Sequence, residues 1–299
     1  MKYIDNNNFK MHDTCVAFGD FDGVHRGHRA VIDRLLKVSG QGLTSVIISF
    51  EYDEPLLEDK TILSTAEEKR YLINDNGPEV LISHRIDSNN RDVPVKRFLK
   101  EIVVDKLGAK AVVAGSSSAN IDILRECADE YGYTLYECND VSHDGERVTA
   151  ERIKHELAQG RLKAANELLG HPYLLIGEVM HGKEIGRTVG MPTANLGYKK
   201  YKQLPAHGVY GTLSEIDGRY LGGLTNIGRR PSVDDYNYVT IETYLLDFSG
   251  DLYGKTITLE IHVFIRGVVK FNNINEVKAQ VNKDIDSVRA YLDTVRLLA

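Results

Sequence analysis

Strand-like and helix-like segments alternate through the first half of the chain, and this alternation limits its possible folds more than any other feature. Short runs of apolar or β-branched residues have the pattern of strands buried on both faces. These runs are Cys15–Phe18, Leu43–Phe50, Glu79–Ser83, Ala109–Ala114 and Thr134–Cys138. Helical patterns lie between them, at Ala30–Val38, Thr65–Asn74, Pro94–Leu107 and Ala119–Tyr131. Alternation at this spacing predicts βαβ units, and hence an α/β domain with a parallel sheet and helices on both faces.

The pattern changes after His171-Pro172, where the proline breaks a helical segment. The segments that follow are short, alternate between apolar and polar residues and are separated by glycine-bearing turns, which favours an antiparallel β-barrel or sandwich. They are Tyr173–His181, Gly208–Ile216, Arg219–Thr225, Val239–Leu246 and Thr256–Ile265. A last helical pattern, Asn275–Leu298, carries one apolar stripe and is expected to pack across the mouth or the side of a small barrel. We therefore predict two domains, residues 1–170 and residues 171–299.

Length and charge exclude several classes of protein. The chain has 299 residues, of which 42% are hydrophobic and 27% charged, so each half is large enough to bury a core. A formal charge of −6 without a basic stretch argues against nucleic-acid binding. No apolar run approaches the roughly 20 residues of a membrane span, and residues 1–10 lack the apolar core of a signal peptide, so a cytoplasmic protein is expected. Cys15, Cys127 and Cys138 have no metal-ligand spacing and are expected to be buried and reduced.

The loop after the first predicted strand reads G-D-F-D-G-V-H-R-G-H at residues 19–28. In parallel sheets ligands bind at the carboxyl ends of the strands, and a helix N-terminus there attracts phosphate. Asp22, Gly23, His25 and His28 are therefore candidate residues of a nucleotide site, where imidazoles would donate to the charge that develops on an α-phosphate. H-x-G-H alone recurs by chance. Preceded by F-D-G-V and a strand, it is fairly specific for the nucleotidyltransferase fold.

A second candidate site lies at residues 182–195, which read G-K-E-I-G-R-T-V-G-M-P-T-A-N. Glycines at four-residue spacing let a backbone pass close to phosphates, two basic side chains add positive charge, and two polar side chains offer oxygen ligands for Mg²⁺. The residues concerned are Gly182, Lys183, Gly186, Arg187, Gly190, Thr193 and Asn195. The glycine spacing alone fits an ordinary turn of a small β domain equally well. The P-T-A-N sequence attached to it favours the phosphate site.

Glu242 lies in a strand-like run between apolar neighbours, Ile241 and Leu245 among them. Strand alternation alone favours an outward-facing carboxylate without a function. Near a bound hydroxyl substrate, the same carboxylate would accept the proton of that hydroxyl as a general base. The residues by themselves leave both interpretations open.

Together these motifs resemble those of the bacterial riboflavin kinase/FAD synthetase family. The most specific matches are G-D-F-D-G-V-H-R-G-H at 19–28, G-R-T-V-G-M-P-T-A-N at 186–195 and G-V-Y-G-T at 208–212. Further matches are T-N-I-G-R-R-P-S at 225–232, I-E-T-Y-L-L-D-F-S-G-D-L-Y-G at 241–254 and I-R-G-V-V-K-F at 265–271. The resemblance covers nearly the whole chain. It implies a Rossmann-like nucleotidyltransferase domain, then a riboflavin kinase barrel with a C-terminal helix.

The resemblance implies a kinase that transfers the γ-phosphate of ATP to the terminal ribityl hydroxyl of riboflavin and so makes FMN. Thr193 and Asn195 would bind Mg²⁺ and the ATP phosphates, and Glu242 would be the general base. Phosphoryl transfer depends mostly on positioning and charge neutralisation, so a glycine-rich loop, one Mg²⁺ and one carboxylate suffice. Arg266 and Phe271 would contact the flavin, whose ring the last helix would help to cover. The family usually has an acidic residue between these two positions, and this chain has none.

The first domain departs from the family at three ligand-contacting segments. Where the family reads T-F-E-P-H-P, this chain has S-F-E-Y-D-E-P at 49–55, so acidic residues replace the histidine. The flavin loop V-G-x-N/D-F-x-F-G is A-G-S-S-S-A-N-I at 114–121, without the aromatic residues. The motif S-S-T-x-I-R is T-A-E-R-I-K at 149–154, where Glu151 replaces a hydroxyl. We therefore expect weak or absent FMN adenylyltransferase activity, with the histidine motif at 19–28 as a vestigial nucleotidyltransferase site.

Other interpretations remain open. In a bifunctional enzyme that makes both FMN and FAD, Arg152, Lys154 and the serines at 116–118 would compensate for the lost motifs. A regulatory protein that responds to flavin or nucleotide without turnover would not need the P-T-A-N and Glu242 set. Class I aminoacyl-tRNA synthetases share H-x-G-H, but this chain has no K-M-S-K-S-like loop and no basic surface for tRNA. The oligomeric state is left unpredicted.

Overall fold

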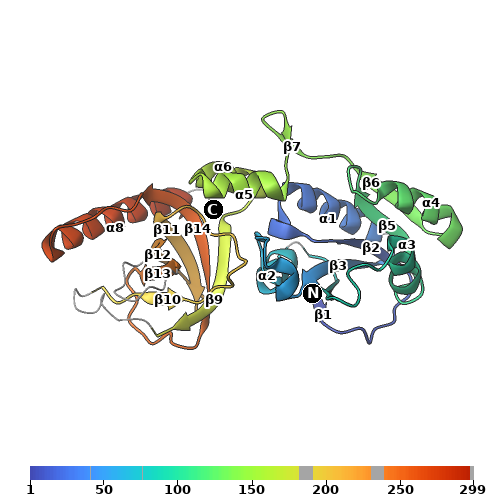
Figure 1. Ribbon diagram of the computed structural model, residues 1–299, viewed down its shortest axis with the longest axis horizontal. Coiled ribbons are helices and arrows are strands. Elements are labelled where there is room, and N and C mark those ends of the chain that lie inside the picture. Colours follow the sequence, from blue (N-terminus) through green and yellow to red (C-terminus); the bar gives the residue numbers. More distant parts are fainter. Residues whose placement is uncertain (41, 76, 182–190, 230–238, 297–299) are drawn as a thin grey trace. The chain divides into compact units, whose positions relative to one another are not determined.

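The computed structural model describes the chain except residues 41, 76, 182–190, 230–238 and 297–299, and the side chains of residues 295 and 296. The chain forms two compact units, Met1–Arg152 and Ile153–Ala299 (Figure 1). The first unit is organised around a parallel sheet and the second around a closed barrel. Both predicted fold classes are therefore present, in the predicted order along the chain.

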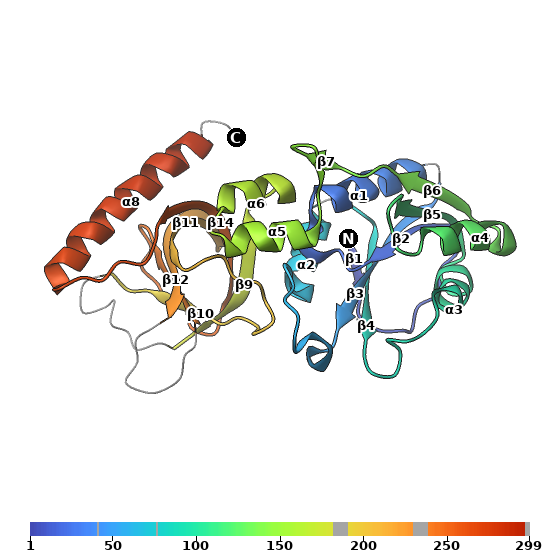
Figure 2. The same ribbon diagram turned by 45° about the horizontal axis from the view of Figure 1, so that its top comes forward.

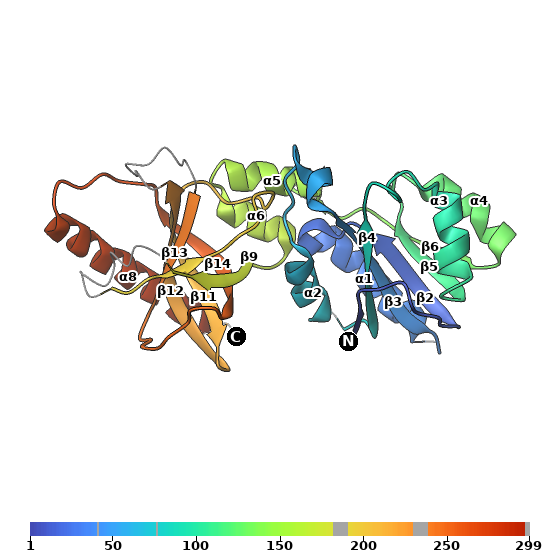
Figure 3. The same ribbon diagram turned by 60° about the horizontal axis from the view of Figure 1, so that its bottom comes forward.

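The first unit is built on a six-stranded parallel sheet with the strand order β1-β4-β3-β2-β5-β6 (Figure 3). The strands are β1 (Lys2–Ile4), β2 (Thr14–Gly19), β3 (Thr44–Tyr52), β4 (Val80–Ile86), β5 (Ala109–Gly115) and β6 (Thr134–Cys138). The helices are α1 (Arg26–Ser39), α2 (Ala66–Asn74), α3 (Val95–Phe98), a π-helical segment at Leu99–Val104 and α4 (Ile121–Tyr131). A hairpin of β7 (Ser142–His143) and β8 (Glu146–Arg147) follows the sheet. The sequence analysis identified every strand of this sheet except β1.

Helices cover the sheet because its strands are apolar on both faces. Val16 and Ile48 pack with Leu99 of the π-helical segment and with α4 in one buried cluster. Successive side chains of a strand point to opposite faces, and α1 packs against β2, β3 and β5 through buried Ile32 and Leu35. Helices thus cover both faces of the sheet, and the loops that follow the strands lie at the carboxyl ends of the strands.

The second unit contains a closed barrel of antiparallel strands in the order β10-β13-β12-β11-β14-β9. The strands are β9 (Tyr173–Met180), β10 (Ala194–Leu196), β11 (Gly208–Ile216), β12 (Arg219–Arg229), β13 (Val239–Leu245) and β14 (Thr256–Arg266). Of the two predicted architectures, barrel and sandwich, the barrel is confirmed. The last helix, α8 (Ile274–Arg296), runs along its outside (Figure 2). Among the described residues, no helix is both long and apolar enough to cross a membrane.

A row of hydroxyl groups joins three strands inside the barrel. Thr212, Thr225 and Thr243 belong to β11, β12 and β13, and each is fully buried. Their Oγ1 atoms are linked by two hydrogen bonds of 2.9 Å each. Because each of these buried hydroxyls has a partner, the three threonines join the strands without leaving a hydroxyl unsatisfied.

The boundary between the units differs from the predicted boundary at residue 170. The division after Arg152 falls within α5 (Ala150–Ala158), and α6 (Leu162–Leu169) belongs to the barrel unit. Asn166 on α6 donates from Nδ2 to the carbonyl oxygen of Ile261 at 3.0 Å, and its Oδ1 accepts from the amide of Tyr173 at 2.9 Å. The proline at 172 thus marks the end of a helix, whereas the packing of that helix decides the unit to which it belongs.

Candidate active site

Three polar residues lie side by side on the outer face of the barrel. Asn195 on β10 is directly opposite Glu242 on β13, and Glu242 is directly opposite Asn226 on β12. Residues directly opposite in an antiparallel pair have Cβ atoms about 4.5–5.5 Å apart and share a face. We call Asn195, Glu242 and Asn226 the polar row. The sequence analysis singled out the first two; Asn226 lies in the matched T-N-I-G segment but no role was assigned to it.

Glu242 is held in place by its own strand. Its side chain is half-buried, and Oε1 accepts a hydrogen bond of 3.2 Å from the hydroxyl of Thr240. Thr240 precedes Glu242 by two positions and therefore shares its face. The carboxylate thus faces outward, as strand alternation indicated, and is also oriented by a neighbouring side chain.

A hollow of about 350 Å³ lies next to the P-T-A-N segment. The residues that line it include Thr193, Phe248 and Tyr253. The ring of His181 stacks on Tyr253 with centroids 3.8 Å apart and planes at 20°. A concave site with aromatic walls and a few polar groups suits a small molecule that contains a flat ring.

The glycine-rich segment before this hollow was predicted to hold phosphates. Gly182, Lys183, Gly186, Arg187 and Gly190 all lie outside the described residues.

The donor atoms of Thr193 and Asn195 suit a hard cation. A hydroxyl and an amide oxygen, with the carboxylate of Glu242 opposite Asn195, are the oxygen ligands that Mg²⁺ accepts. In the described ranges, no group of three or more His, Cys, Asp or Glu side chains is arranged to hold a metal ion. A cation at this place would therefore take its remaining ligands from phosphate and water, as Mg²⁺ commonly does.

Arg266, predicted to contact a flavin, forms a buried ion pair with helix α8. Its Nε and Nη2 atoms lie 2.9 and 2.8 Å from Oδ2 of Asp284, whose side chain is 2% exposed. Gln280 donates to the other oxygen of Asp284 at 2.8 Å. The guanidinium of Arg266 also lies 5.7 Å from the ring centre of Phe271. These contacts fix α8 to the end of β14, a role that the motif I-R-G-V-V-K-F did not reveal.

Replacing Asp284 with alanine is expected to lower the free energy of unfolding of the barrel unit by about 3 kcal/mol, because it leaves the partly buried charge of Arg266 without its partner. Urea unfolding of the full chain, followed by circular dichroism, measures the change. Asp293→Asn, on an exposed position of the same helix, is the control and should change stability by less than about 0.5 kcal/mol. Equal stability of Asp284→Ala and the control would show that the pair does not hold the helix.

The two histidines of the first unit form a stacked pair at the start of α1. Nδ1 of His25 accepts hydrogen bonds from the amides of Gly27 at 3.1 Å and His28 at 3.3 Å, so His25 caps the helix. The rings of His25 and His28 stack with centroids 3.7 Å apart. Because Nδ1 is an acceptor, the proton of neutral His25 is on Nε2. Asp22, by contrast, accepts from the amides of Leu63 and Ser64 and so organises the segment before α2.

Burial keeps both imidazoles neutral. Desolvation lowers the pKa of His25 to about 4, against an opposing effect of Asp22, and it lowers the pKa of His28 well below its usual value. The unfolded chain binds a proton at the ordinary pKa of about 6.5. The contribution of neutral His25 to the stability of the first unit is therefore fully present above pH 6.5 and is lost as the pH falls from 6.5 towards 4.

Acidification from pH 7 to pH 5 is expected to destabilise the first unit by about 2 kcal/mol through His25. Asn caps helices well and does not titrate, so His25→Asn should lose less protection than the wild type. Hydrogen exchange of the α1 amides, measured by mass spectrometry, tests this, since the ratio of the two proteins at one pH cancels the chemical exchange rate. Equal losses in the two proteins would show that His25 does not titrate as described.

Comparisons with known proteins match both units. Family models match as FAD synthetase over residues 8–152 and riboflavin kinase over residues 169–292. The bifunctional riboflavin kinase/FMN adenylyltransferase of Pseudomonas fluorescens is 31% identical over 294 residues, which span 93% of each chain. The chain belongs to this family. The enzyme of the same name from Escherichia coli K12 is 30% identical, over 93% of this chain and 92% of its own.

A solved structure has the same fold over nearly the full length of this family member. It is described as a macrolide-efflux protein from Streptococcus pneumoniae, is 25% identical and gives a TM-score of 0.81. The match covers 96% of this chain and 98% of the solved one. The arrangement of a parallel α/β unit followed by a barrel is therefore shared with a crystal structure.

The segments in which this chain departs from the family are engaged in contacts of their own. Asp53 forms a two-pronged ion pair with Arg85 at 2.5 and 2.7 Å, and Tyr52 donates to Asp20 at 2.8 Å. Ser117 donates to Asp140 at 2.5 Å. Tyr52, Asp53 and Ser117 thus bond to other residues of the protein, at positions where the motifs of the family have ligand-contacting residues.

Arg152 and Glu151, which are neighbours in the chain, interact with different parts of the first unit. Arg152 donates to the carbonyl oxygens of His143 and Glu146 at 3.0 Å each, so it secures the β7–β8 hairpin. Glu151 lies close enough to His25 for its charge to raise the pKa of that ring, although burial prevails. A carboxylate is thus near the imidazole that would donate to phosphate.

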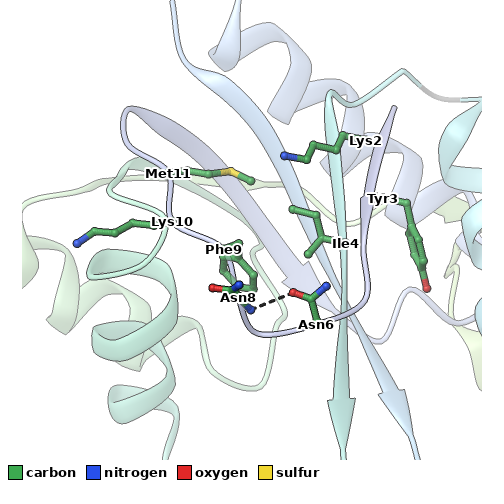
Figure 4. Close-up of a pocket in the computed structure, with 8 residues that line it drawn as sticks. All are labelled: Lys2, Tyr3, Ile4, Asn6, Asn8, Phe9, Lys10 and Met11. Carbon is green, nitrogen blue, oxygen red and sulfur yellow. Dashed lines mark hydrogen bonds between the residues drawn. The ribbon is translucent and has the colours of Figure 1, made fainter.

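A second hollow, of about 390 Å³, lies beside β1 (Figure 4). Lys2, Ile4, Phe9 and Met11 contribute to its lining, and the amide of Asn8 donates to Oδ1 of Asn6 at 3.0 Å. Its cationic and amide side chains are exposed to solvent. We assign no ligand to it.

Proposed function

We propose that this chain is a riboflavin kinase that transfers the γ-phosphate of ATP to the 5′-hydroxyl of riboflavin and releases FMN and ADP. The observation that carries the proposal is the pairing of Asn195 and Glu242 on neighbouring strands, beside a hollow that Thr193 lines. One carboxylate next to oxygen ligands for a cation is the set that a phosphoryl transfer to a hydroxyl requires. The match of the riboflavin kinase model to residues 169–292 supports the substrate.

In this mechanism Thr193 and Asn195 hold Mg²⁺ and the phosphates of ATP. When bound, Mg²⁺ neutralises the charge on those phosphates. Glu242, oriented by Thr240, accepts the proton of the 5′-hydroxyl of riboflavin. The hydroxyl oxygen bonds to the γ-phosphorus of ATP as the bond between that phosphorus and the oxygen of the leaving ADP breaks. The hollow beside Thr193 receives the adenine ring against Phe248 and Tyr253.

The flavin lies near the start of α8 in this proposal. Phe271 and Arg266 would contact it, with Arg266 held by Asp284 and therefore fixed in direction. The side chains of Val268 and Val269 are 63% and 51% exposed and offer an apolar surface for the ring system. Burying such surface on binding stabilises the complex by about 25 cal/mol for each Å² removed from water.

The first unit has weak or absent FMN adenylyltransferase activity in this proposal. Glu151 places a negative charge near His25, and Arg152 is engaged with the β7–β8 hairpin. Asp53, where the family has a histidine, is neutralised by Arg85 within the protein. Asp22, Gly23, His25 and His28 then form a vestigial site that serves the fold.

A bifunctional enzyme that also makes FAD is the second candidate. The geometry of the histidine pair favours it, because Nε2 of His25 is the protonated nitrogen and stays available as a donor. The FAD synthetase model also matches residues 8–152, and both relatives are named as bifunctional. The two candidates agree on the kinase and differ on the first unit.

Incubation of the full chain with riboflavin, ATP and Mg²⁺, followed by separation of the flavins, tests the kinase. FMN is expected to accumulate, and chelation of Mg²⁺ should stop its formation. Binding of riboflavin without any FMN would contradict the kinase and favour a regulatory protein that does not turn over.

A further inference from the structure

The outer face of β12 is covered by α8 over one part of its length and is exposed over the next. Gly222 and Leu224 lie under α8, where Leu292 packs and leaves no room for a side chain at position 222. Asn226, the next residue on this face, is exposed. The uncovered part of the face therefore begins at Asn226, next to Glu242 of the polar row.

The amide of Asn226 is available to a ligand. In the part of the chain that the structure describes, its side chain makes no hydrogen bond, whereas Glu242 accepts one from Thr240. An exposed amide on a strand is common, so availability alone assigns nothing. Its place is informative because Asn226 flanks Glu242 on the side opposite Asn195.

We propose that Asn226 binds the hydroxyl next to the reacting hydroxyl of the acceptor and so selects a polyol chain. This inference rests on the proposed kinase function. In phosphoryl transfer the attacking and leaving oxygens are roughly in line, so the rest of the acceptor extends away from the donor. With the donor phosphates at Asn195 and the attacking oxygen at Glu242, the acceptor chain extends past Asn226.

The chemistry of the surface beyond Glu242 fits such a chain. An amide supplies both a donor and an acceptor, which is what a hydroxyl group needs. A methyl group added to Gly228 would lie 3.9 Å from Nδ2 of Asn226 and 3.9 Å from Cγ2 of Val268, so the missing side chain leaves space between them. The polar row thus leads to the exposed apolar side chain of Val268. A polyol that ends in a flat apolar ring system matches this sequence of surfaces.

The test compares riboflavin with 4′-deoxyriboflavin in the wild type and in Asn226→Ala. A site built to bond a hydroxyl discriminates against the analogue that lacks it. The wild type is expected to use 4′-deoxyriboflavin with a kcat/KM about 10-fold below that for riboflavin, and Asn226→Ala should show a ratio within about twofold of one. The KM for ATP should stay unchanged in the variant. Asn282→Ala, an exposed asparagine of α8, is the matched control and should keep the wild-type ratio.

A ratio in Asn226→Ala equal to that of the wild type overturns the proposal, as does a wild type that does not discriminate. Binding separates this failure from a failure of the kinase. If the wild type forms no FMN, dissociation constants for the two flavins, measured by quenching of flavin fluorescence, replace kcat/KM. The same loss of discrimination in Asn226→Ala then supports the contact even though the kinase is contradicted.

Discussion

Replacing Glu242 with glutamine is expected to lower kcat for FMN formation by about 10²- to 10⁴-fold, which is the usual contribution of a general base. The amide keeps an oxygen that can accept from Thr240, so the side chain should keep its place in the polar row. It has no useful basicity and leaves the proton on the 5′-hydroxyl. Riboflavin binding, measured by quenching of flavin fluorescence, should stay within about threefold of the wild type.

The control for this substitution is Glu215→Gln. Glu215 is an exposed glutamate on β11 of the same barrel, so its replacement removes the same charge from the unit without touching the polar row. It should change kcat by less than about twofold. If Glu242→Gln kept a kcat within about threefold of the wild type, another group would have to take the proton and the assignment of the base would be wrong.

Supplied with FMN and ATP alone, the wild type is expected to form FAD at least about 10³-fold more slowly than it forms FMN from riboflavin. Each lost contact costs on the order of 1 to 3 kcal/mol, and losses in three ligand-contacting segments together remove several decades of rate. Glu151 is expected to add repulsion, because its negative charge acts on the ring of His25, where phosphate would bind. Separation of the flavins after incubation measures both rates in the same preparation.

A double variant probes the cause of this low rate. Ala150→Ser with Glu151→Thr restores the hydroxyls of the family motif and removes the charge, and should raise FAD formation by about tenfold, equivalent to about 1.4 kcal/mol. Glu130→Thr removes a charge from an exposed position of α4 and should leave the rate unchanged. FAD formation by the wild type at a rate comparable to FMN formation would contradict the vestigial site and establish the bifunctional enzyme.

Sequence patterns predicted the strands that are buried on both faces and missed the shortest ones. β2 to β5 contain runs of buried apolar residues, as expected for strands whose two faces are covered by helices. β1 and β10 have three residues each, too few to show a period. They exist because they pair with strands far away in the sequence, β1 with β4 and β10 with β13 and β9.

The candidate site, too, could be predicted from the sequence only in part. Motifs identified Asn195 and Glu242, but only the register of β10, β13 and β12 shows that they are neighbours and that Asn226 completes the row. The sequence predicted a flavin contact for Arg266 and missed its ion pair with Asp284, because that pair depends on how α8 packs. Local spacing carries no information about either contact.

The cap at the start of α1 gives the histidine motif a structural role that is independent of catalysis. His25 closes the first turn of the helix, and a side chain on Gly27 would come within 3.0 Å of Cε1 of that ring. A stable helix start therefore requires both the histidine and the glycine whether or not the first unit is catalytically active. The presence of H-x-G-H is accordingly no evidence of adenylyltransferase activity by itself, and substitutions at positions such as 151 are the better test of that activity.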